Sequence, residues 1–395
     1  MKLNDIAYFV EDKISSENIK LDQYVTTDSL LQNKKGRTFA QNLPPQKCSL
    51  VHFKKGDVLL GNIRPYLKKI WYANIEGGCS QDVLVLRAKN NLESKFLYAL
   101  LMQDSFFDYE MKATKGSKMP RGDKSHIINF PCLDLNNKTE IGKLLSSLDD
   151  KIALNNRINA KLEQMAKRLY EHWFVQFDFP NTDGNPYKSS GGKMVWNEIL
   201  KREIPDGWEV GNLYDIAEYV NGLACQNYRP KESEKSLPVI KIREMNEGIT
   251  ADTEKVSASI PGKYRIYAGD ILFSWSASLE IKIWTGETGG LNQHIFKVIP
   301  KGYFSKGYVY QQLSAYLVNF QKMAESRKTT MGHITSDHIK QSRILIPPKE
   351  IISAFTKKTL SIFNYQLSIE KETQKLTALR DRLLPLLMNG QVEVN

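Results

Sequence analysis

The sequence predicts a mixed α/β (α+β) protein in which two similar globular domains are joined by two long helices that form an antiparallel coiled coil. Three observations predict this fold. One unit of sequence occurs twice, each copy holds strand-like runs followed by a helical stretch, and each copy is followed by a long segment with a heptad pattern. A length of 395 residues is well above that of one average domain, and 41% hydrophobic residues are enough to build two cores.

Five short motifs occur twice in the same order, separated by 210 to 213 residues. The pairs are Asp5-Ile6-Ala7 with Asp215-Ile216-Ala217, Gly56-Asp57 with Gly269-Asp270, Ile70-Trp71 with Ile283-Trp284, Gly77-Gly78 with Gly289-Gly290, and His126-Ile127 with His338-Ile339. Any single match would be noise, but five in order indicate a duplication. A period of this length is far too long for a solenoid or a propeller. We therefore expect two copies of one domain.

Each copy predicts the same succession of elements. A Gly-Asp turn signal precedes a pair of β-type apolar runs, and a helical stretch, a basic loop and a strand-like run ending at proline follow. The expected strands are 57–61 and 69–72 in the first copy and 270–275 and 281–285 in the second. The expected helical stretches are 95–112 and 306–325, because apolar residues recur there at steps of three and four.

Two segments of about 30 residues show the alternating three- and four-residue steps of a coiled coil. The expected positions are Leu148, Ile152, Asn155, Asn159, Leu162, Ala166, Leu169 and Trp173 in the first segment, and Ile362, Tyr365, Ile369, Glu372, Leu376, Leu379, Leu383 and Leu386 in the second. Polar residues in such a stripe set register, which favours a mutual coiled coil over packing of each helix on its own domain. An antiparallel pair is expected, since a parallel pair would need the whole second copy as a return loop.

These features define the expected domain boundaries. The first globular domain covers residues 1–135, and the central spacer helix covers 136–180. A linker at 181–200 follows, because the sequence around it is rich in turn-forming residues. The second globular domain covers 201–348, and the C-terminal spacer helix covers 349–395.

The composition limits the class of protein. Lys and Arg number 55 against 44 Asp and Glu, a net charge of +11, which favours polyanion binding, although solubility alone could explain it. Mean hydropathy is −0.42, and no apolar run approaches the ~18–20 residues of a membrane helix. Asp5 and Glu11 interrupt any signal-peptide core. The four cysteines form no Cys-x-x-Cys pair, which argues against a disulfide scaffold or a thiolate zinc site and suits a reducing cytosol.

The sequence lacks the common catalytic signatures. It has no phosphate-binding Gly-x-x-x-x-Gly-Lys-Ser/Thr loop and no Gly-x-Gly-x-x-Gly after a strand, and its histidines lack metal-site spacing. Asp270, Glu280 and Lys282 resemble the Asp…Glu-x-Lys arrangement of magnesium-dependent nucleases. In the sister copy, however, Leu67 stands where Glu280 would be expected, which favours a turn role for Asp270. A stand-alone nuclease stays as the alternative function.

Basic and amide side chains gather in corresponding loops, as DNA binding requires. Lys and Arg suit phosphates, whereas Arg, Asn and Gln suit base edges. The candidates are Lys115, Lys118, Arg121 and Lys124 with Arg327, Lys328, Thr329 and His333 in the sister loop; Asn62, Arg64, Lys68 and Lys69 with Ser276 around the strand pair; and Gln226, Asn227, Arg229, Lys241 and Arg243. Solvated loop charges are the plainer interpretation, but similar frames with divergent loops suit two different half-site readers.

The order of parts and several motifs together resemble a known family. The motifs are Leu148-Asp149-Asp150-Lys151-Ile152 followed by Asn155-Asn156 and Trp173-Phe174, then Gly207-Trp208-Glu209, Asn62-Ile63-Arg64-Pro65, and Leu383-Leu384-Pro385-Leu386-Leu387-Met388-Asn389-Gly390. Over essentially its whole length the chain resembles the specificity subunits of type I restriction-modification enzymes. One departure is that the first copy lacks the lead-in 205–209 of the second, so its N-terminal edge is expected to be trimmed or packed differently.

The resemblance implies a non-catalytic, cytoplasmic DNA-recognition subunit. Each globular copy would be a target recognition domain that reads one half of a bipartite double-stranded DNA target. The two helices would set the gap between the halves and dock two modification (methyltransferase) subunits. Those partners would carry S-adenosylmethionine, and restriction (motor-nuclease) subunits would join them, with ATP and Mg, for cleavage. No cofactor or metal is expected in this chain.

Overall fold

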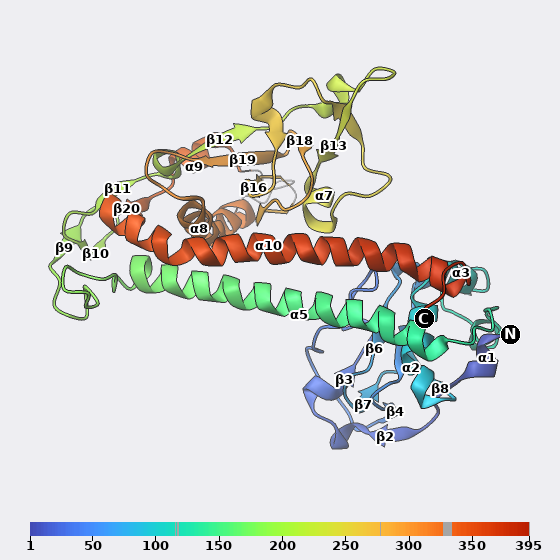
Figure 1. Ribbon diagram of the computed structural model, residues 1–395. Helices are drawn as coiled ribbons and strands as arrows, with labels where there is room; N and C mark the ends of the chain where they lie inside the picture. The colour runs from blue at the N-terminus through green and yellow to red at the C-terminus, as the bar shows by residue number, and fades with distance from the viewer. Residues whose placement is uncertain (115, 117, 277, 327–333, 395) are drawn as a thin grey trace. The chain divides into compact units, whose positions relative to one another are not determined.

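The computed structural model describes residues 1–114, 116, 118–276, 278–326 and 334–394. Its contacts divide the chain into two units, Met1–Leu154 with Gln374–Asn395, and Asn155–Thr373. Each unit contains one copy of the duplicated sequence and part of each long helix, α5 (Lys138–Tyr170) and α10 (Lys349–Met388) (Figure 1).

The first unit is built on two sheets. An antiparallel sheet has the order β1 (Ala7–Phe9), β8 (Val83–Ala88), β5 (Val58–Gly61) and β6 (Ile70–Tyr72). A second sheet has the order β2 (Lys13–Ser15), β4 (Ser49–Phe53), β7 (Gly77–Cys79) and β3 (Tyr24–Val25), with β3 parallel to β7. The helices are α1 (Leu3–Ile6), α2 (Ser94–Leu101), α3 (Asp104–Met111) and α4 (Lys124–Ile127). Helix α2 packs on β5, β6 and β8.

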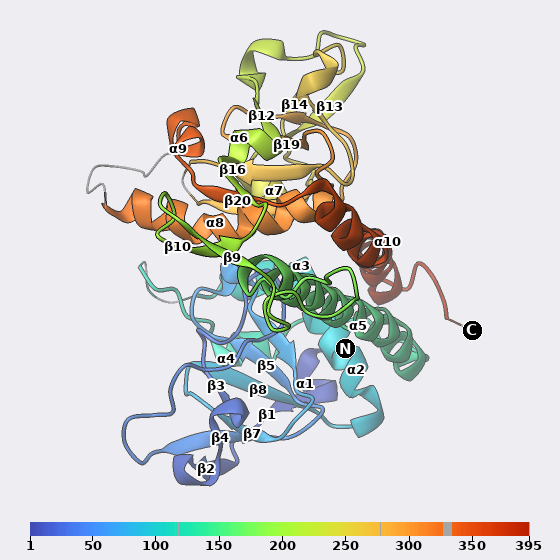
Figure 2. The same ribbon diagram turned by 90° about the vertical axis from the view of Figure 1, so that its left-hand side faces the viewer.

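The second unit repeats this plan, as the duplication predicts. Its main sheet has the corresponding order β12 (Ala217–Asn221), β19 (Ile295–Pro300), β16 (Ile271–Ser274) and β17 (Glu280–Ile283). Its second sheet has the order β14 (Lys255–Ser257), β13 (Ser236–Ile240), β18 (Gly289–Leu291) and β15 (Arg265–Ile266). The helices are α6 (Leu213–Ile216), α7 (Ile242–Glu247), α8 (Lys306–Ser326) and α9 (Ser336–Lys340). Helix α8 packs along the main sheet (Figure 2).

The second sheets of the two units match in their centres and differ at their edges. Strands β3, β7 and β4 correspond to β13, β18 and β15, and in both units the first two of these strands are parallel. The additional strand joins opposite sides, since β2 pairs with β4 in the first unit and β14 pairs with β13 in the second. The duplicated frames therefore carry different edges.

The N-terminal edge of the first unit is packed differently, as its missing lead-in predicts. In the second unit β11 (Glu209–Gly211) pairs with β20 (Ile344–Ile346). In the first unit a single bridge between Lys2 and Pro131 takes that place. The segment 181–200, expected as a linker, includes strand β9 (Met194–Asn197), which pairs with β10 (Arg202–Pro205).

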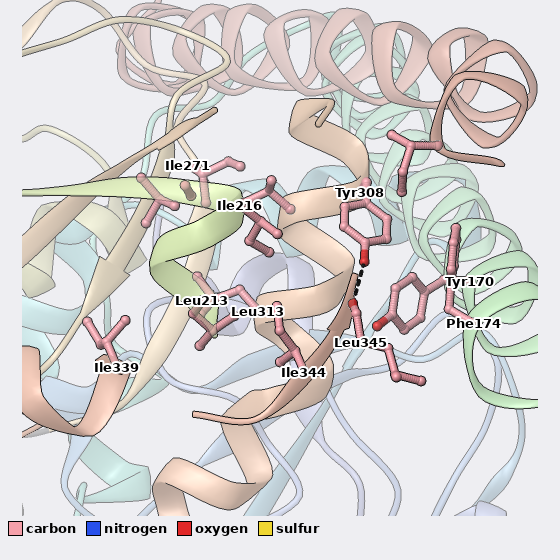
Figure 3. Packing of buried hydrophobic residues seen from close by; sticks show 14 of the residues in the cluster. Tyr170, Phe174, Leu213, Ile216, Ile271, Tyr308, Leu313, Ile339, Ile344 and Leu345 are labelled. Carbon is pink, nitrogen blue, oxygen red and sulfur yellow. Dashed lines mark hydrogen bonds between the residues drawn. The ribbon is translucent and has the colours of Figure 1, made fainter. Parts of the chain in front are cut away.

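Each unit has its own core, to which the long helices contribute. In the second unit, Tyr170 and Phe174 from the end of α5 pack beside Tyr308 of α8, whose hydroxyl donates to the carbonyl of Leu345 at 3.4 Å (Figure 3). Phe355 of α10 lies in the same cluster. In the first unit, residues Ile141, Leu145, Leu384, Leu387 and Met388 of α5 and α10 pack with the helices and strands of the domain. The long helices thus pack on the domains as well as on each other.

Within each unit α5 and α10 pair in opposite directions. In the second unit, Asn155 Nδ2 donates to Glu372 Oε2 at 2.9 Å and Asn159 Nδ2 donates to Glu370 Oε2 at 3.1 Å. In the first unit, Arg380 bonds Asp149 at 2.9 Å. An advance along α5 therefore corresponds to a retreat along α10, which confirms the antiparallel coiled coil. Polar stripe residues hold it, as the asparagines in the pattern suggested.

The eight predicted spacer residues lie on the partly or fully buried sides of the two helices: Leu148, Ile152, Leu162, Leu169, Ile362, Ile369, Leu376 and Leu383. The other positions expected in the second segment were wrong by one residue. Tyr365 and Leu379 are 53% and 44% exposed, whereas Thr373 and Leu387 are buried. Burying the following residue instead lets Arg380 reach Asp149.

The helical stretch expected at 95–112 is two helices, α2 and α3, rather than one. The chain breaks at Gln103, whose backbone is extended (φ −66, ψ 143) and whose side-chain amide donates to the carbonyl of Leu100 at 3.1 Å. That bond satisfies a carbonyl at the end of α2, and Asp104 then begins α3 with a negative charge at its N-terminus. Periodicity alone did not reveal this break, because the apolar steps continue across it.

Candidate nucleic-acid interface

Two of the predicted basic clusters meet in the first unit. The N–H of Gly122 donates to the carbonyl of Asn62 at 3.2 Å, and the N–H of Arg64 donates to the carbonyl of Pro120 at 2.8 Å. Ile63 and Arg121 form an isolated antiparallel bridge between these bonds. Residues 62–64 and 118–124, called the paired loops from here on, therefore form one surface, although about 60 residues separate them in sequence.

The geometry of the turn after β5 keeps Arg64 in place. Arg64 and Lys68 both have left-handed backbones (φ 54 and φ 50) on either side of a short 3-10 turn, Pro65–Leu67. Such conformations are costly for residues other than glycine and persist only where surrounding contacts hold them. Here the N–H groups of Asn33 and Lys34 donate to the carbonyls of Leu67 and Lys68, both at 2.9 Å.

Four predicted cations on the paired loops are exposed: Arg64, Lys118, Arg121 and Lys124. Arg121 forms an ion pair with Asp82 at 3.1 Å, and both side chains stay largely open to solvent. The ammonium group of Lys124 lies 5.4 Å from the centre of the Phe9 ring. Lys115 lies outside the described residues. The surface thus combines cations for phosphates with an arginine pair suited to phosphates or base edges.

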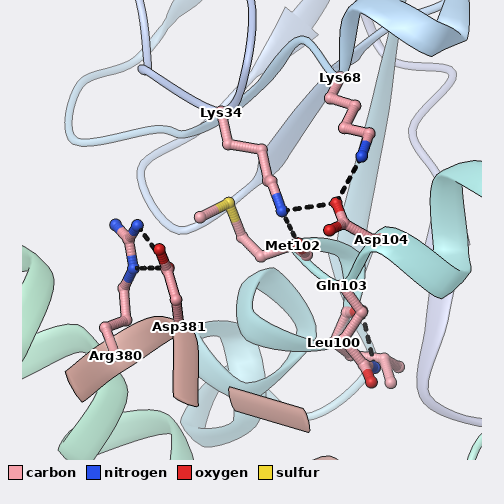
Figure 4. A network of polar contacts seen from close by, with 8 residues as sticks. All are labelled: Lys34, Lys68, Leu100, Met102, Gln103, Asp104, Arg380 and Asp381. Carbon is pink, nitrogen blue, oxygen red and sulfur yellow. Dashed lines mark hydrogen bonds and ion pairs between the residues drawn. The ribbon is translucent and has the colours of Figure 1, made fainter. Parts of the chain in front are cut away.

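The predicted candidates Lys68 and Lys69 have partners inside the fold. Lys68 and Lys34 both bind Asp104 Oδ1, at 2.7 and 2.9 Å (Figure 4). Burial opposes ionisation of Asp104, but these two lysines lower its pKa below the ordinary value. Lys69 donates to the carbonyl of Thr27 at 2.5 Å. These contacts fasten the turn that presents Arg64, so both lysines have a structural role.

The second unit joins the corresponding segments in the same way. The N–H of Ile334 donates to the carbonyl of Trp275 at 3.0 Å, and the indole of Trp275 donates to Asn221 at 3.1 Å. Ser276 is buried, at 7% exposed, so its hydroxyl does not lie on the open surface. Four predicted residues of the sister loop lie outside the described residues: Arg327, Lys328, Thr329 and His333.

The third predicted group is brought together at the edge formed by β14. Gln226 and Asn227 lie on a short 3-10 turn, Cys225–Tyr228, that contacts β14, and both are exposed. Lys241 binds Glu254 at 2.6 Å. This hydrogen bond, aided by the charges of Arg229 and Arg243, lowers the pKa of Glu254. Arg243 also binds the buried carboxylate of Glu244 at 2.6 Å. The five residues thus contribute to one polar, mainly basic surface.

The residues of the alternative nuclease site do not converge. Asp270 accepts from the N–H of Tyr267 at 2.9 Å and binds Lys306 at 3.2 Å, as a turn residue does. Ile271 pairs with Ile283 and Ser274 with Glu280, so Asp270 and Glu280 lie at opposite ends of the hairpin, roughly 13 Å apart along the strand. Lys282 bonds Asn246 instead. No group of three metal-binding side chains occurs among the described residues, and the nuclease alternative has no support.

The sequence did not single out three residues of the first-unit surface. Tyr66 is half exposed at the tip of the left-handed turn, where an aromatic residue directly after a proline was the available signal. Lys34 and Asp104 anchor that turn, but 70 residues separate them and no local pattern connects them. In the described part of the chain, no helix has the length and apolar character needed to cross a membrane.

Comparisons with known proteins agree with this architecture. The family model described as "Type I restriction modification DNA specificity domain" matches residues 1–164 and 205–379, once for each copy. The type I restriction enzyme HindI specificity subunit of Haemophilus influenzae is 27% identical over 435 residues, covering 93% of this chain and 94% of that protein. The MjaIX specificity subunit of Methanocaldococcus jannaschii is 25% identical over 362 residues, covering 88% and 80%.

A solved structure shares the fold. The crystal structure of the type I restriction-modification system S subunit from M. genitalium aligns with a TM-score of 0.59 over 100% of this chain and 96% of that one, at 13% identity. The family model covers well over half of the chain, and its two matches coincide with the two copies. This chain therefore belongs to the type I restriction-modification DNA specificity family, whose members are the DNA-recognition subunits of these systems.

Proposed function

We propose that this chain is a non-catalytic specificity subunit in which each unit reads one half of a bipartite double-stranded DNA target. The observation that carries the proposal is that the two units share one main-sheet topology but differ in the edges and loops attached to it. A conserved frame with divergent loops is what two readers of different half-sites require.

The surface chemistry supports DNA as the ligand. The paired loops of the first unit combine four exposed cations with a rigid turn, and the second unit presents Gln226, Asn227 and Arg229 beside Lys241. Cations neutralise phosphates, while arginine and amide side chains can pair with base edges. The committed assignments of individual residues to DNA contact remain proposals, with Lys68 and Lys69 acting through the turn that they fasten.

The long helices support a spacer role. Both α5 and α10 contribute to both units, and α5 alone has 33 residues, hence roughly 50 Å of helix. In this proposal the pair fixes the gap between half-sites and docks two modification (methyltransferase) subunits. Those partners, together with restriction (motor-nuclease) subunits, supply S-adenosylmethionine, ATP and Mg in the cytoplasm. The relatives' names as restriction-enzyme specificity subunits support such a complex.

Mapping of modified bases tests the two-reader proposal. The chain is co-expressed with the modification subunits of its own genome, and methylated adenines are mapped in the host DNA. A variant with Lys118, Arg121 and Lys124 changed to Ser should alter or weaken one half-site and leave the other intact. The control changes Lys20, Lys54 and Lys89, exposed lysines elsewhere in the same unit, to Ser and should leave the map unchanged.

Two outcomes would contradict the proposal. Equal loss at both half-sites in the loop variant, with the control intact, would show that the units do not read separately. Cleavage or methylation of duplex DNA by the purified chain alone, supplied with Mg and S-adenosylmethionine, would show that the chain is catalytic.

A further inference from the structure

A buried carboxyl group lies beneath the paired loops. Glu110, near the end of α3, is 0% exposed, and neither of its side-chain oxygens has a hydrogen-bond partner within the described part of the chain. Oδ1 of Asn62, in the paired loops, is also buried and likewise without a donor among the described residues. Buried polar atoms are nearly always paired, so two unpaired acceptors in one place call for an explanation.

Both acceptors border the same gap beside Gly122. A carbon built as a Cβ on Gly122 would lie 2.5 Å from Glu110 Oε1, 2.9 Å from Asn62 Oδ1 and 3.1 Å from Ile127 Cδ1. The backbone of Gly122 is not left-handed, so its lack of a side chain serves this close approach. Two oxygens that can only accept would repel each other here, whereas one protonated oxygen would satisfy both.

The charged and titratable neighbours of Glu110 have contacts of their own. On α3 and α4, Tyr109 and His126 stack at 4.0 Å, and His126 Nε2 bonds the carbonyl of Tyr109. On the loop, Arg121 pairs with Asp82, and Asp123 accepts from the N–H of Ser125. The remaining groups on these elements are lysines that are exposed or half-buried: Lys112, Lys118 and Lys124. None of these charges contributes to the pKa shift of Glu110, which burial alone causes.

We infer that Glu110 is a positioning residue whose protonated carboxyl donates a hydrogen bond to Oδ1 of Asn62 and thereby holds the paired loops in their DNA-binding arrangement. The inference deepens the proposed function, on which its last clause rests. Burial raises the pKa of Glu110 to about 8, so the group is mainly neutral at pH 7. The chain thus has a buried acid that acts as a donor, as a carboxylic acid in an apolar site can.

The duplication supplies an internal control. With an offset of 213 residues, which aligns Phe107 with Phe320, Glu110 corresponds to Met323. Met323 is a half-buried residue that packs on the core of the second unit. Only the first unit therefore carries the carboxyl, and only the first half-site should depend on its protonation.

Amide exchange tests the positioning directly, without DNA. The N–H groups of Gly122 and Arg64 make the bonds between the paired loops, so their exchange reports on loop pairing. Wild type is compared with Glu110→Gln, whose amide can donate to Asn62 at every pH, and with Glu110→Met, the residue of the sister unit. Because each pH is compared across variants, intrinsic exchange cancels.

The expected result follows from the neutral fraction. At pH 6.5 wild type and the Gln variant should protect these amides equally, while one pH unit above the pKa wild type should be about tenfold less protected. The Met variant should be less protected than the Gln variant at all pH values. Equal protection of wild type and the Gln variant from pH 6 to 9.5 would overturn the inference, as would equal protection of the Gln and Met variants.

Binding to DNA tests the consequence. The probe is a duplex that carries the mapped target, and its two half-sites are mutated in turn. Affinity for the first half-site should fall about tenfold more in wild type than in the Gln variant between pH 7 and 9, while the second half-site should show no such difference. If exchange changes as expected but neither protein binds duplex DNA at any pH, the proposed function fails and the positioning of the loops by Glu110 stands.

Discussion

Asp57 and Asp270 occupy the same place in the two copies and perform the same local task with different partners. Each accepts from the N–H of the residue three positions earlier, at 2.7 and 2.9 Å. Asp57 is fully buried and makes a two-pronged pair with Arg87 of β8, at 2.7 and 2.8 Å. Asp270 instead binds Lys306 of α8, which is much more exposed. Equal turns therefore carry unequal electrostatic loads.

Removing these carboxylates should destabilise the chain to different extents. Asp57→Ala leaves the guanidinium of Arg87 largely buried without its partner, a change that costs about 3–5 kcal/mol for buried pairs. Asp270→Ala leaves an exposed ammonium and should cost about 1 kcal/mol beyond the shared loss of the turn bond. Urea unfolding followed by circular dichroism measures both, and equal losses would contradict the argument.

The stability of the chain should depend on pH through Glu110. Its pKa is about 8 in the folded chain, against 4.5 as the ordinary value. Between these values the folded state holds one proton more than the unfolded state, so the contribution is complete below pH 4.5 and is lost as pH rises towards 8. Each pH unit in that window should remove about 1.4 kcal/mol relative to Glu110→Gln. Urea midpoints of the two proteins at pH 5 and pH 8 measure this, and a constant difference between them would exclude the effect.

Residue types predicted much of the first-unit surface but not the roles of its lysines. Arg64 and Lys124 lie on the surface that their composition suggested. Lys68 was assigned to DNA, yet it fastens the turn through Asp104, a partner 36 residues away. A sequence pattern records charge and spacing, whereas this role depends on a left-handed backbone and a long-range contact.

At the scale of elements, the heptad pattern predicted the two helices and their pairing, but it was ambiguous in register. Ile369 and Leu376 fit two stripes, one that continues through apolar Tyr365 and Leu379 and one that continues through Thr373 and Arg380. Hydrophobicity favours the first stripe, and the structure has the second. A polar contact across the pair decided the register, because Arg380 in the stripe meets the mostly buried carboxylate of Asp149 at 2.9 Å.

Substitutions in α10 should show which register the protein uses. Arg380→Ala leaves Asp149, whose pKa burial already raises against the opposing effect of this arginine, without its partner. We expect a loss of about 2–3 kcal/mol, below the range for fully buried pairs. Leu379→Ala, the adjacent control, removes a 44% exposed side chain and should cost less than about 1 kcal/mol. Thermal unfolding of both variants measures the difference, and a larger loss for Leu379→Ala would restore the originally expected stripe.

At the scale of the whole molecule, the duplication was the most powerful sequence signal. Motifs at a constant offset predicted two equal frames, and the main sheets share one strand order. The edges of the smaller sheets were not predictable, because β2 and β14 have no counterparts in the other copy and short strands leave weak patterns. Shared sequence thus reports the frame, while the parts that differ between copies are the ones proposed to distinguish half-sites.

The spacer proposal predicts that the helices can be lengthened in whole heptads. Seven residues inserted after Leu154 of α5 and seven after Thr373 of α10, where the chain divides into its two units, preserve the stripe of both helices. Each insertion adds about 10 Å of helix, close to three base pairs of duplex. Mapping of modified sites should then show unchanged half-sites separated by a gap about three base pairs longer. The same insertion in α5 alone should displace Asn155 from Glu372 and reduce modification, since only one strand of the pair is extended. An unchanged gap in the double insertion would mean that the helices do not measure the target.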